Sequence, residues 1–388
     1  MAKTQRIAIP PLPLSERFYG VLLELGKRMG LPVADPSKLS AAVAALSHTY
    51  TRERGELLRG NLGDQAPLAR LGFFLPRDAI KMFGPLGELT AAGYFRDRKV
   101  LRVLDLGAGL GSSTLGLARY LRFAELPVER LEVTAIERDP ASTRLMGGLV
   151  DALKTLPAEL VPVALDVRAA DLHDLSEPGP FDVILLGFVL NELFLERTAA
   201  ERPALRAGLL DLLARKLRPN GAMIVLEPAL KQSARELMAT RDALPRDELH
   251  VFAPCVRSGP CPMLEGERDW CHEALDYALP PHLVDVARRA GLRYQGLSYA
   301  ALVLTKKPRA QHAPHDTLYR IVSDPLLSKG KRELFGCGER GYQRLTRLDR
   351  DASADNRGFD LLRRGDLVAL PTLRVERATS VPSPTRKA

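Results

Sequence analysis

The sequence predicts a doubly wound α/β sheet, preceded by a helical region and followed by a small β domain. Between residues 99 and 230, short apolar runs rich in β-formers alternate with helical segments, in the order VLRVLDLG, LEVTAIE, PVALDVRAADL, FDVILLGFVL and GAMIVLEP. This alternation indicates βαβ units, which build parallel sheets through right-handed crossovers. Before residue 99, apolar residues recur every three or four positions behind serine caps, as in SERFYGVLLELGKRMG and SKLSAAVAALSHTYTRER, which predicts helices.

The same patterns divide the chain into four parts. We expect a helical region at 1–98, an α/β core at 99–307 with a cysteine-rich insertion at 250–280, a small OB-like β domain at 308–375 and a disordered tail at 376–388. The helical PHLVDVARRAG and the strand-like SYAALVLTKK are expected to complete the core. KPRAQHAPHD reads as a linker, and LYRIVS, KRELFGCG, YQRLTRL and GDLVAL predict the strands of the last domain.

Composition limits the class of protein. The chain has 388 residues, of which 46% are hydrophobic, enough for more than one core. No apolar run approaches the roughly 20 residues that would cross a bilayer, and the N-terminus lacks the apolar segment of a secretory signal, so we expect a cytoplasmic protein without a membrane partner. The net charge of +9 favours a polyanion such as nucleic acid, although a basic surface without such a partner has the same charge.

The segment VLRVLDLGAGLGSSTL predicts a ligand loop between a strand and a helix. Gly107, Gly109 and Gly111 allow a tight turn and a close approach of a ligand to the backbone, and the helix start offers free N–H groups. The spacing differs from the G-x-G-x-x-G fingerprint of dinucleotide sites. Asp105, two residues before the first glycine, suits a ligand with an ammonium group, such as the methionine part of S-adenosylmethionine.

Two further acids follow the next strands. Glu137 ends LEVTAIE, where a carboxylate can hold both ribose hydroxyls, and Asp171 follows the third strand within reach of an adenine amino group. Asp171 can equally be a helix cap or a surface acid. Together, the loop, Glu137 and the strand order resemble the class I S-adenosylmethionine-dependent methyltransferases over residues 99–230. A loop of this family that no longer binds the cofactor is the alternative.

The segment after the fourth strand leaves the catalytic residues open. Methyltransferases of this fold that act on base amines usually carry Asn/Asp-Pro-Pro-aromatic there, whereas this chain has GFVLNELF. Asn191 and Glu192 are candidates to face a substrate at the carboxyl edge of the sheet, or to cap the next helix. A cysteine nucleophile is disfavoured, because Cys255 and Cys261 lie well beyond the fifth strand.

The chain has four cysteines, three of them between residues 255 and 271. In a reducing compartment, clustered cysteines more often bind metal or react than form disulfides. Cys255, Cys261, Cys271 and Cys337 lack the paired C-x-x-C knuckles of a zinc ribbon, but four thiolates can hold an iron–sulfur cluster without regular spacing. A zinc site and four unligated buried cysteines remain alternatives. His272 is expected to pack beside the site.

Several segments resemble the methyltransferase-like proteins of small-ribosomal-subunit assembly, known from mitochondria and bacteria. The resemblance covers nearly the whole chain and is carried by PCVRSGPCPM…DWCH, LSYAALVLTKK, LEPALKQSARELMATRDAL, KGKRELFGCGERG…GDLV, ALSHTY and FFLPRDAIKMFGPLGEL. It implies that the four cysteines ligate a [4Fe–4S] cluster that pins the β domain onto the core, and that the protein binds small-subunit rRNA. Glu273 stands where an aromatic residue is usual, which puts the local packing in doubt.

Basic residues surround the fourth cysteine. Cations alternate with apolar residues and with Tyr342 at Lys329, Lys331, Arg332, Arg340, Arg344 and Arg347. In a small β barrel this pattern offers phosphate contacts beside a stacking surface for RNA. An edge strand that is protected by its charges gives the same pattern.

These observations lead to one main hypothesis and two alternatives. The first is a factor that binds S-adenosylmethionine, contains an iron–sulfur cluster and acts on the small ribosomal subunit, as an rRNA methyltransferase or an assembly factor, monomeric off the ribosome. The second is an active methyltransferase on a non-ribosomal substrate, with a structural four-cysteine zinc site. The third is a catalytically inactive, RNA-binding assembly chaperone.

Overall fold

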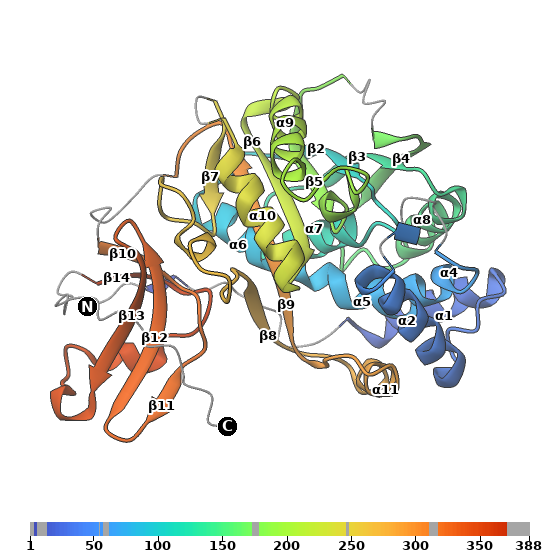
Figure 1. Cartoon of the computed structure of the whole chain (residues 1–388). Helices are drawn as coiled ribbons and strands as arrows, with labels where there is room; N and C mark the ends of the chain where they lie inside the picture. Colours follow the sequence, from blue (N-terminus) through green and yellow to red (C-terminus); the bar gives the residue numbers. More distant parts are fainter. Residues whose placement is uncertain are drawn as a thin grey trace.

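The computed structural model of the chain describes residues 4–5, 14–53, 55–56, 62–172, 178–245, 248–309 and 317–370. It has two sheets, a large one at the centre of the molecule and a small one at one end (Figure 1). Helices between residues 16 and 78 lie on the side of the molecule away from the small sheet, whereas the helix Phe83–Ala91 lies closer to it (Figure 1). Within the described residues, no helix combines the length and the apolar character needed to cross a membrane.

The large sheet confirms the predicted doubly wound fold. Its strand order is β4-β3-β2-β5-β6-β9-β7, with β8 paired to β9. Strands β2 to β6 run parallel, and β9 is antiparallel to its neighbours. The strands are β2 (Val100–Leu106), β3 (Arg130–Glu137), β4 (Val163–Ala169), β5 (Phe181–Gly187), β6 (Leu217–Pro228), β7 (His250–Ala253), β8 (Glu273–Ala278) and β9 (Gln295–Thr305). Because the order reverses between β2 and β5, a ligand crevice is expected at their carboxyl ends.

Both faces of the central strands are apolar, because helices cover both. In β2, Leu101 and Val103 join one buried cluster, while Leu104 and Leu106 join the other. The side-chain alternation of a strand directs successive residues to opposite faces, so a continuous apolar run is what a doubly covered strand requires. The covering helices are α7 (Ser112–Phe123), α8 (Pro140–Leu153), α9 (Arg202–Ala214) and α10 (Lys231–Ala243), while α11 (Pro281–Arg289) packs against the N-terminal helix Pro36–Thr51.

The N-terminal helices continue the first of these clusters and are not a separate body. They are α1 (Glu16–Arg28), α2 (Pro36–Thr51), α4 (Ala66–Ala69), the π-helical turn η1 (Arg70–Phe74), α5 (Leu75–Asp78), the 3-10 turn η2 (Ala79–Met82) and α6 (Phe83–Ala91). Ser15 caps α1 as expected. The expected serine cap of α2 is wrong: Asp35 caps it, accepting from the N–H groups of Ser37 and Lys38 at 3.0 Å, because a carboxylate before the Pro36 start reaches both free donors.

The small sheet contains the four predicted C-terminal strands and two that the sequence did not indicate. Its strands are β1 (Thr4–Gln5), β10 (Leu318–Ile321), β11 (Leu326–Ser328), β12 (Lys331–Gly338), β13 (Gly341–Leu348) and β14 (Leu367–Ala369). Its own core includes Tyr319, Ile321, Leu334 and Leu345. The unexpected member β1 pairs with β14, so the first described residues complete the last sheet. The predicted tail at 376–388 and most of the predicted linker lie outside the described residues.

Candidate functional site

The glycine loop follows β2 at the reversal point of the sheet. Gly107, Gly109 and Gly111 have φ angles of +61°, +55° and +83°, which side chains rarely adopt. A Cβ atom on Gly107 would lie 2.4 Å from the Val189 side chain, so the loop also needs glycine for its close approach to the segment after β5. Gly111 is the N-cap of α7, which leaves the first N–H groups of that helix at the ligand edge.

Asp105 is enclosed by the helix that follows the loop. Its side chain is 1% exposed, and the Thr114 hydroxyl donates to its carboxylate at 2.6 Å. Burial raises the pKa of Asp105 to about 7, although the hydrogen bonds from Thr114 favour the charged form. Asp105 therefore lies behind the loop and links α7 to β2 through Thr114, and its predicted contact with a ligand ammonium group stays a prediction.

Glu137 is the acid that the structure joins directly to the loop. Its two carboxylate oxygens accept from the N–H groups of Gly109 at 2.8 Å and of Asp139 at 2.9 Å. Each oxygen keeps a further lone pair, so the carboxylate can still accept from ligand hydroxyls. Asp171 lies two residues beyond the end of β4 and is exposed.

The segment after β5, residues 188–194, is held by hydrogen bonds to its own backbone and to buried side chains beneath it. The Asn191 side-chain amide donates to the Phe188 carbonyl oxygen at 3.0 Å, and the Asn191 N–H donates to Glu227 at 3.1 Å. The buried Arg206 donates to the carbonyl oxygens of Asn191 and Leu193. The Asn191 amide thus bonds to its own loop, where it shapes the backbone.

The backbone of this segment is strained at two aromatic residues. Phe188 and Phe194 have φ angles of +63° and +61°, in the left-handed region that costs non-glycine residues energy. Burial raises the pKa of Glu227, beneath the segment, to about 8. Strained residues over a buried acid at the carboxyl edge are typical of a functional site rather than of a simple connection.

Polar residues from the N-terminal helices complete the same edge, and the sequence reasoning missed them. Arg70, at the start of the π-helical turn, donates to the Tyr50 hydroxyl at 3.1 and 3.2 Å and to the Ser142 hydroxyl at 3.0 Å. Burial opposes its charge, but Tyr50, Glu137 and Glu192 raise the pKa of Arg70. Glu192 is therefore close enough to Arg70 for the two charges to interact. A lone arginine in the apolar stretch LARLGFFLP was the available signal.

Lys81 is a second missed cation at this edge. Its ammonium pairs with Asp78 at 2.7 Å and lies 4.8 Å from the centre of the Phe188 ring. Burial lowers the pKa of Lys81 to about 8, although Asp78 favours the charged form. The residue connects the N-terminal helices to the strained segment after β5.

All four cysteines line one cavity between the two sheets. It encloses about 590 Å³, part of it open to solvent, and its walls include Met238, Met263, Arg241 and Arg257. Cys255 follows β7, Cys261 precedes a short 3-10 turn, Cys271 precedes β8 and Cys337 lies in β12. None of the four forms a disulfide. The predicted set therefore converges from sequence positions 82 residues apart, a span counted from 255 to 337.

The cavity is apolar around the thiols and cationic beside them. Burial raises the pKa of Cys261 to about 11 and that of Cys337 to about 12, and the neighbouring Cys255 adds to both shifts. Arg241 donates to the carbonyl oxygens of Arg257 and Gly259 at 2.7 and 2.5 Å. Within the described part of the chain, no three or more His, Cys, Asp or Glu side chains form a group that could hold a metal ion.

His272 lies beside the thiols as a packing residue would. Its ring stacks on Trp270 with the centroids 5.8 Å apart, and burial lowers its pKa. The Trp270 indole donates to the Ala229 carbonyl oxygen at 3.0 Å, which fixes the stack against the end of β6.

The predicted RNA-contact residues divide between the two faces of the small sheet. Arg332 lies opposite Arg347 in the β12–β13 ladder, and both approach Asp360, at 4.0 and 2.7 Å. By strand alternation the other face carries Cys337, Tyr342 and Arg344. Lys331 also belongs to that face and pairs with Glu333 at 2.9 Å, while Lys329 and Arg340 lie exposed at the strand ends.

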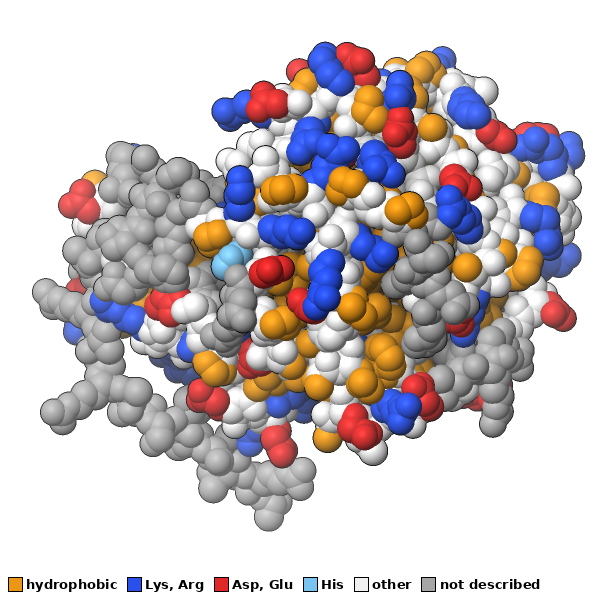
Figure 2. Space-filling view, turned by 90° about the horizontal axis from the view of Figure 1, so that it is seen from above, with side chains coloured by type: hydrophobic (Ala, Val, Ile, Leu, Met, Phe, Trp, Pro, Cys, Tyr) orange, Lys and Arg blue, Asp and Glu red, His pale blue; other side chains and the backbone are white. Residues whose placement is uncertain are grey.

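The aromatic residues of this face form a stack. The Phe335 and Tyr342 rings lie 5.1 Å apart at 22°, and the Arg344 guanidinium lies 5.4 Å from the Phe335 ring centre. Elsewhere cations are spread widely: Figure 2 shows Lys and Arg side chains across the face seen from above, with acidic side chains among them. Arg344 thus places a charge beside the Phe335 ring, while Phe335 and Tyr342 also pack against the buried cluster of Met238, Met263 and Val322.

Comparison with known proteins gives a family match and distant relatives. The family described as mitochondrial small ribosomal subunit Rsm22 matches residues 97–354. Carboxy-S-adenosyl-L-methionine synthases of Salmonella paratyphi C and Salmonella choleraesuis are each 27% identical over 175 residues, which is 42% of this chain and 63% of theirs. The chain thus matches less than two thirds of the length of these curated relatives.

Two solved structures illustrate the structural neighbours. A SAM-dependent O-methyltransferase from Thermotoga maritima has a TM-score of 0.32 and 14% identity, covering 59% of this chain and 67% of that one. A SAM-dependent methyltransferase from Thiobacillus denitrificans in complex with S-adenosyl-L-homocysteine has a TM-score of 0.31 and 15% identity, covering 57% and 92%.

Proposed function

The chain belongs to the Rsm22 family, described as mitochondrial small ribosomal subunit Rsm22, and from this premise we propose that it binds S-adenosylmethionine and acts on the small ribosomal subunit. The match covers residues 97–354, which include the glycine loop and all four cysteines. The observation that carries the cofactor proposal is the hydrogen bond from the Gly109 N–H to Glu137 at 2.8 Å. It sets the loop and the acid side by side at the reversal point of the sheet, where this fold binds ligands.

In this proposal the loop residues and three acids hold the cofactor. The glycine loop gives its backbone close access to the ligand, Glu137 accepts from the ribose hydroxyls, and Asp171 stands after β4 for the adenine end. Asp105 acts from behind the loop, and we assign it to loop shape together with attraction for the ammonium group. When bound, S-adenosylmethionine supplies an electrophilic methyl group, and the chain contributes its orientation and the exclusion of water.

The four cysteines are proposed to hold a [4Fe–4S] cluster, with zinc as the alternative. The donor set supports this, because four thiolates suit iron–sulfur clusters and zinc and few other groups. All four thiols border one cavity, which offers room for a group of several atoms. Arg241 and Arg257 at the cavity wall would balance the charge of the thiolates.

The proposed substrate or partner is small-subunit rRNA. The charge of +9, the family description and the stack of Tyr342, Phe335 and Arg344 support this assignment. An assembly factor without methyl transfer is a second candidate, because the Asn191 amide is engaged within its own loop. In that case the cofactor site would serve folding or regulation.

The test of the cofactor proposal is calorimetry on the purified protein. We expect S-adenosylmethionine to bind, and Glu137→Ala to weaken it about ten- to hundredfold, since a charge-assisted hydrogen bond contributes roughly 1.5–3 kcal/mol. Glu129→Ala is the matched control, because Glu129 pairs with Lys99 on the surface. Wild-type protein that binds neither S-adenosylmethionine nor S-adenosylhomocysteine would contradict the proposal. Small-subunit rRNA that copurifies with the protein from its host would separate a ribosomal role from a non-ribosomal one.

A further inference from the structure

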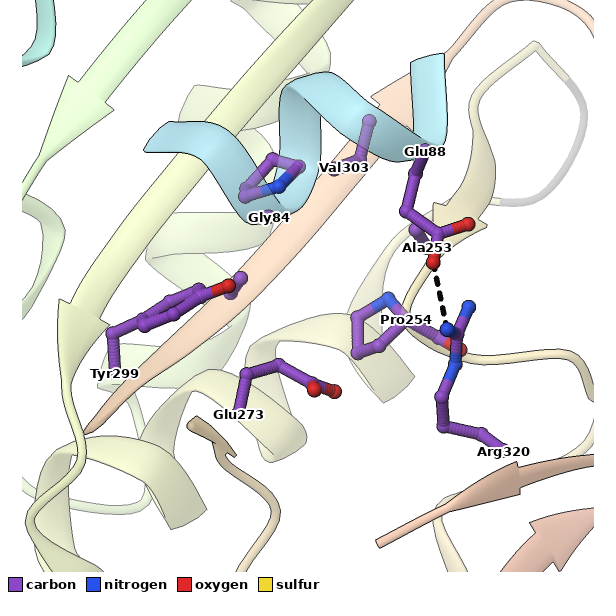
Figure 3. A pocket seen from close by; sticks show the side chains of 10 residues that line it. Gly84, Glu88, Ala253, Pro254, Glu273, Tyr299, Val303 and Arg320 are labelled. Atoms are coloured by element: carbon purple, nitrogen blue, oxygen red, sulfur yellow. Dashed lines mark hydrogen bonds and ion pairs between the residues drawn. The ribbon is translucent and has the colours of Figure 1, made fainter. Parts of the chain in front are cut away.

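A second, smaller cavity of about 290 Å³ adjoins the cysteine cavity at the junction of three parts of the chain. The two cavities share Pro254, Glu273 and Ala301 in their walls. Figure 3 shows the side chains that enclose it: Glu88 from α6, Tyr299 from β9 and Arg320 from β10 of the small sheet. The N-terminal helices, the core and the small sheet therefore meet beside the thiols.

Arg320 makes the contacts that cross this junction. It is 3% exposed, and its guanidinium donates to the Pro254 carbonyl oxygen at 3.1 Å and to the Gly365 carbonyl oxygen at 2.6 Å. Pro254 immediately precedes Cys255. In the β10–β12 ladder, Arg320 lies directly opposite Cys337. One side chain thus joins the backbone next to one thiol to the strand that carries another.

Glu88 fixes this arginine from the third part of the chain. Its carboxylate accepts from Arg320 at 2.6 Å and from Arg309 at 2.7 Å, and it is 6% exposed (Figure 3). Buried charges persist where their partners are well placed, and removal of one partner leaves the other uncompensated. The Arg320 guanidinium also has one buried nitrogen, Nη2, without a hydrogen-bond partner, so its orientation is set by Glu88 and the two carbonyls.

We propose that Arg320, held by Glu88, is a positioning residue that sets Cys337 against Cys255 across the domain junction before any metal is bound. This rests on the proposed function only in that the four cysteines form one site. Its hydrogen bonds go to Glu88 and to backbone carbonyls, so we assign its effect on the thiols to the Pro254 backbone and the β10–β12 ladder. The ion pair between Glu88 and Arg320 then organises the cysteine site even in protein without metal.

The test measures thiol proximity in protein without metal. With serine at Cys261 and Cys271, only Cys255 and Cys337 remain, and a short bismaleimide can join them after chelator treatment under reducing conditions. We expect efficient cross-linking in this background. Arg320→Met should lower the cross-linking rate about tenfold, because it removes charge-assisted hydrogen bonds to both sides of the junction.

Arg309→Met is the matched control. Arg309 also pairs with Glu88, but it donates in addition to the Phe252 carbonyl oxygen, which lies on the core side of the junction. We expect it to cross-link at a rate close to that of the parent. Arg320→Lys keeps the positive charge but loses the planar guanidinium that bonds several acceptors at once. Its cross-linking rate should lie between those of the parent and Arg320→Met. If Arg320→Met does not fold, Glu88→Gln, which leaves Arg320 in place without its anchor, should lower the rate in the same direction.

Equal cross-linking rates in the parent and in Arg320→Met or Glu88→Gln would overturn the proposal, as would an equal loss in Arg309→Met. Failure of the metal proposal looks different. Wild-type protein that takes up neither iron nor zinc, while Arg320→Met still lowers cross-linking, would leave the positioning role intact and refute the cluster.

Discussion

The glycine-loop site and the cysteine cavity are both built at the large sheet, but in opposite ways. In the first, the loop, Asp105, Glu137 and the groups that these acids bond all lie within residues 105–139, and Arg70 and Asp171 approach from outside this segment. The second takes its thiols from segments that end in two different sheets, and it is mostly apolar. A site made of local contacts is fixed by its own motif, whereas a site at a junction depends on every contact that holds the junction together.

The two sites are also separated by the sheet itself. Strand β7, which leads into Cys255, is four strand positions from β2, which leads into the glycine loop. At about 4.8 Å per strand, this is roughly 19 Å. Substitutions that far apart usually act independently, so each site can be perturbed while the other serves as an internal control.

The largest expected effect is on the cysteine cavity. Serine at Cys261 should reduce bound iron in anaerobically purified protein from about four per chain to near zero, because the cluster needs four thiolates. S-adenosylmethionine affinity, measured by calorimetry on the same sample, should stay near the wild-type value. If the wild-type protein is colourless and holds one zinc per chain after iron–sulfur reconstitution, the site binds zinc and the cluster assignment is wrong. A large loss of cofactor affinity would show that the two sites are coupled.

The second effect concerns the junction. Glu88→Ala leaves Arg309 and Arg320 without their shared carboxylate and should lower the free energy of unfolding by about 3–5 kcal/mol, measured with denaturant. Asp285→Ala, which breaks an exposed pair with Arg289, is the control and should cost less than about 1 kcal/mol. If Glu88→Ala lowered the free energy of unfolding as little as Asp285→Ala, the junction would not depend on the ion pairs of Glu88.

The third effect is a pH dependence that arises behind the glycine loop. Burial raises the pKa of Asp105 from its ordinary value of 3.8 to about 7, so between these pH values the folded state binds a proton that the unfolded state has lost. Stability from this group is therefore present below about pH 4 and is lost as the pH rises toward 7. Between pH 4 and 7 the free energy of unfolding of the wild type should fall by an amount of the order of 3 kcal/mol because of this group. Asp105→Asn should not show this fall, which denaturant unfolding at a series of pH values would measure. Identical pH profiles in the two proteins would contradict it.

A fourth effect tests whether the N-terminal helices belong to the glycine-loop site. Arg70→Met removes the guanidinium that faces Glu137 and Glu192, and S-adenosylmethionine affinity should fall about tenfold. Arg130→Met, which breaks an exposed pair with Glu132, should leave binding unchanged. Wild-type affinity in Arg70→Met would restrict the cofactor site to the loop and strands.

The smallest effect distinguishes the two faces of the small sheet. Arg344→Gln should reduce the salt dependence of rRNA binding by about one counterion, since an exposed arginine beside a stacked ring can reach a phosphate. Arg347→Gln should leave that slope unchanged, because Arg347 is 13% exposed and pairs with Asp360. If Arg347→Gln lowered the salt slope and Arg344→Gln did not, the RNA would lie on the other face. If neither variant changed the slope, the RNA would not bind to this sheet.

The sequence predicted what rests on local pattern. The strand–glycine–helix order of 100–123, the alternation of the core strands and the grouping of the cysteines all have signals within a few residues. The sequence also predicted a run of basic residues around Cys337, and period-two alternation distributes them over two faces: Arg332 and Arg347 share one face, and Arg344 lies on the other. Reading the alternation through β12 and β13 would have found this.

The remainder depends on contacts between distant residues. Glu88 and Arg320 are 232 positions apart, and neither stands in a recognisable motif. Arg70 reaches Ser142 and Tyr50 only because the helices fold over the carboxyl edge. Thr4 and Gln5 pair with β14, which no periodicity in two residues could indicate. Tertiary packing determines which of these distant residues pair, and no local pattern in a single sequence indicates the pairing.

The position of β9 has a consequence for how the chain is made. In the described residues, β7 is hydrogen-bonded to β9 alone, and β9 ends at Thr305. During synthesis, the strand leading into Cys255 therefore has no place in the sheet until about fifty more residues have left the ribosome, counted from 255 to 305. By then the strands β2 to β6 can already have paired in order. The glycine loop would be finished while the cysteines are still unassembled, so the protein would be ready for its small ligand before it could accept a metal.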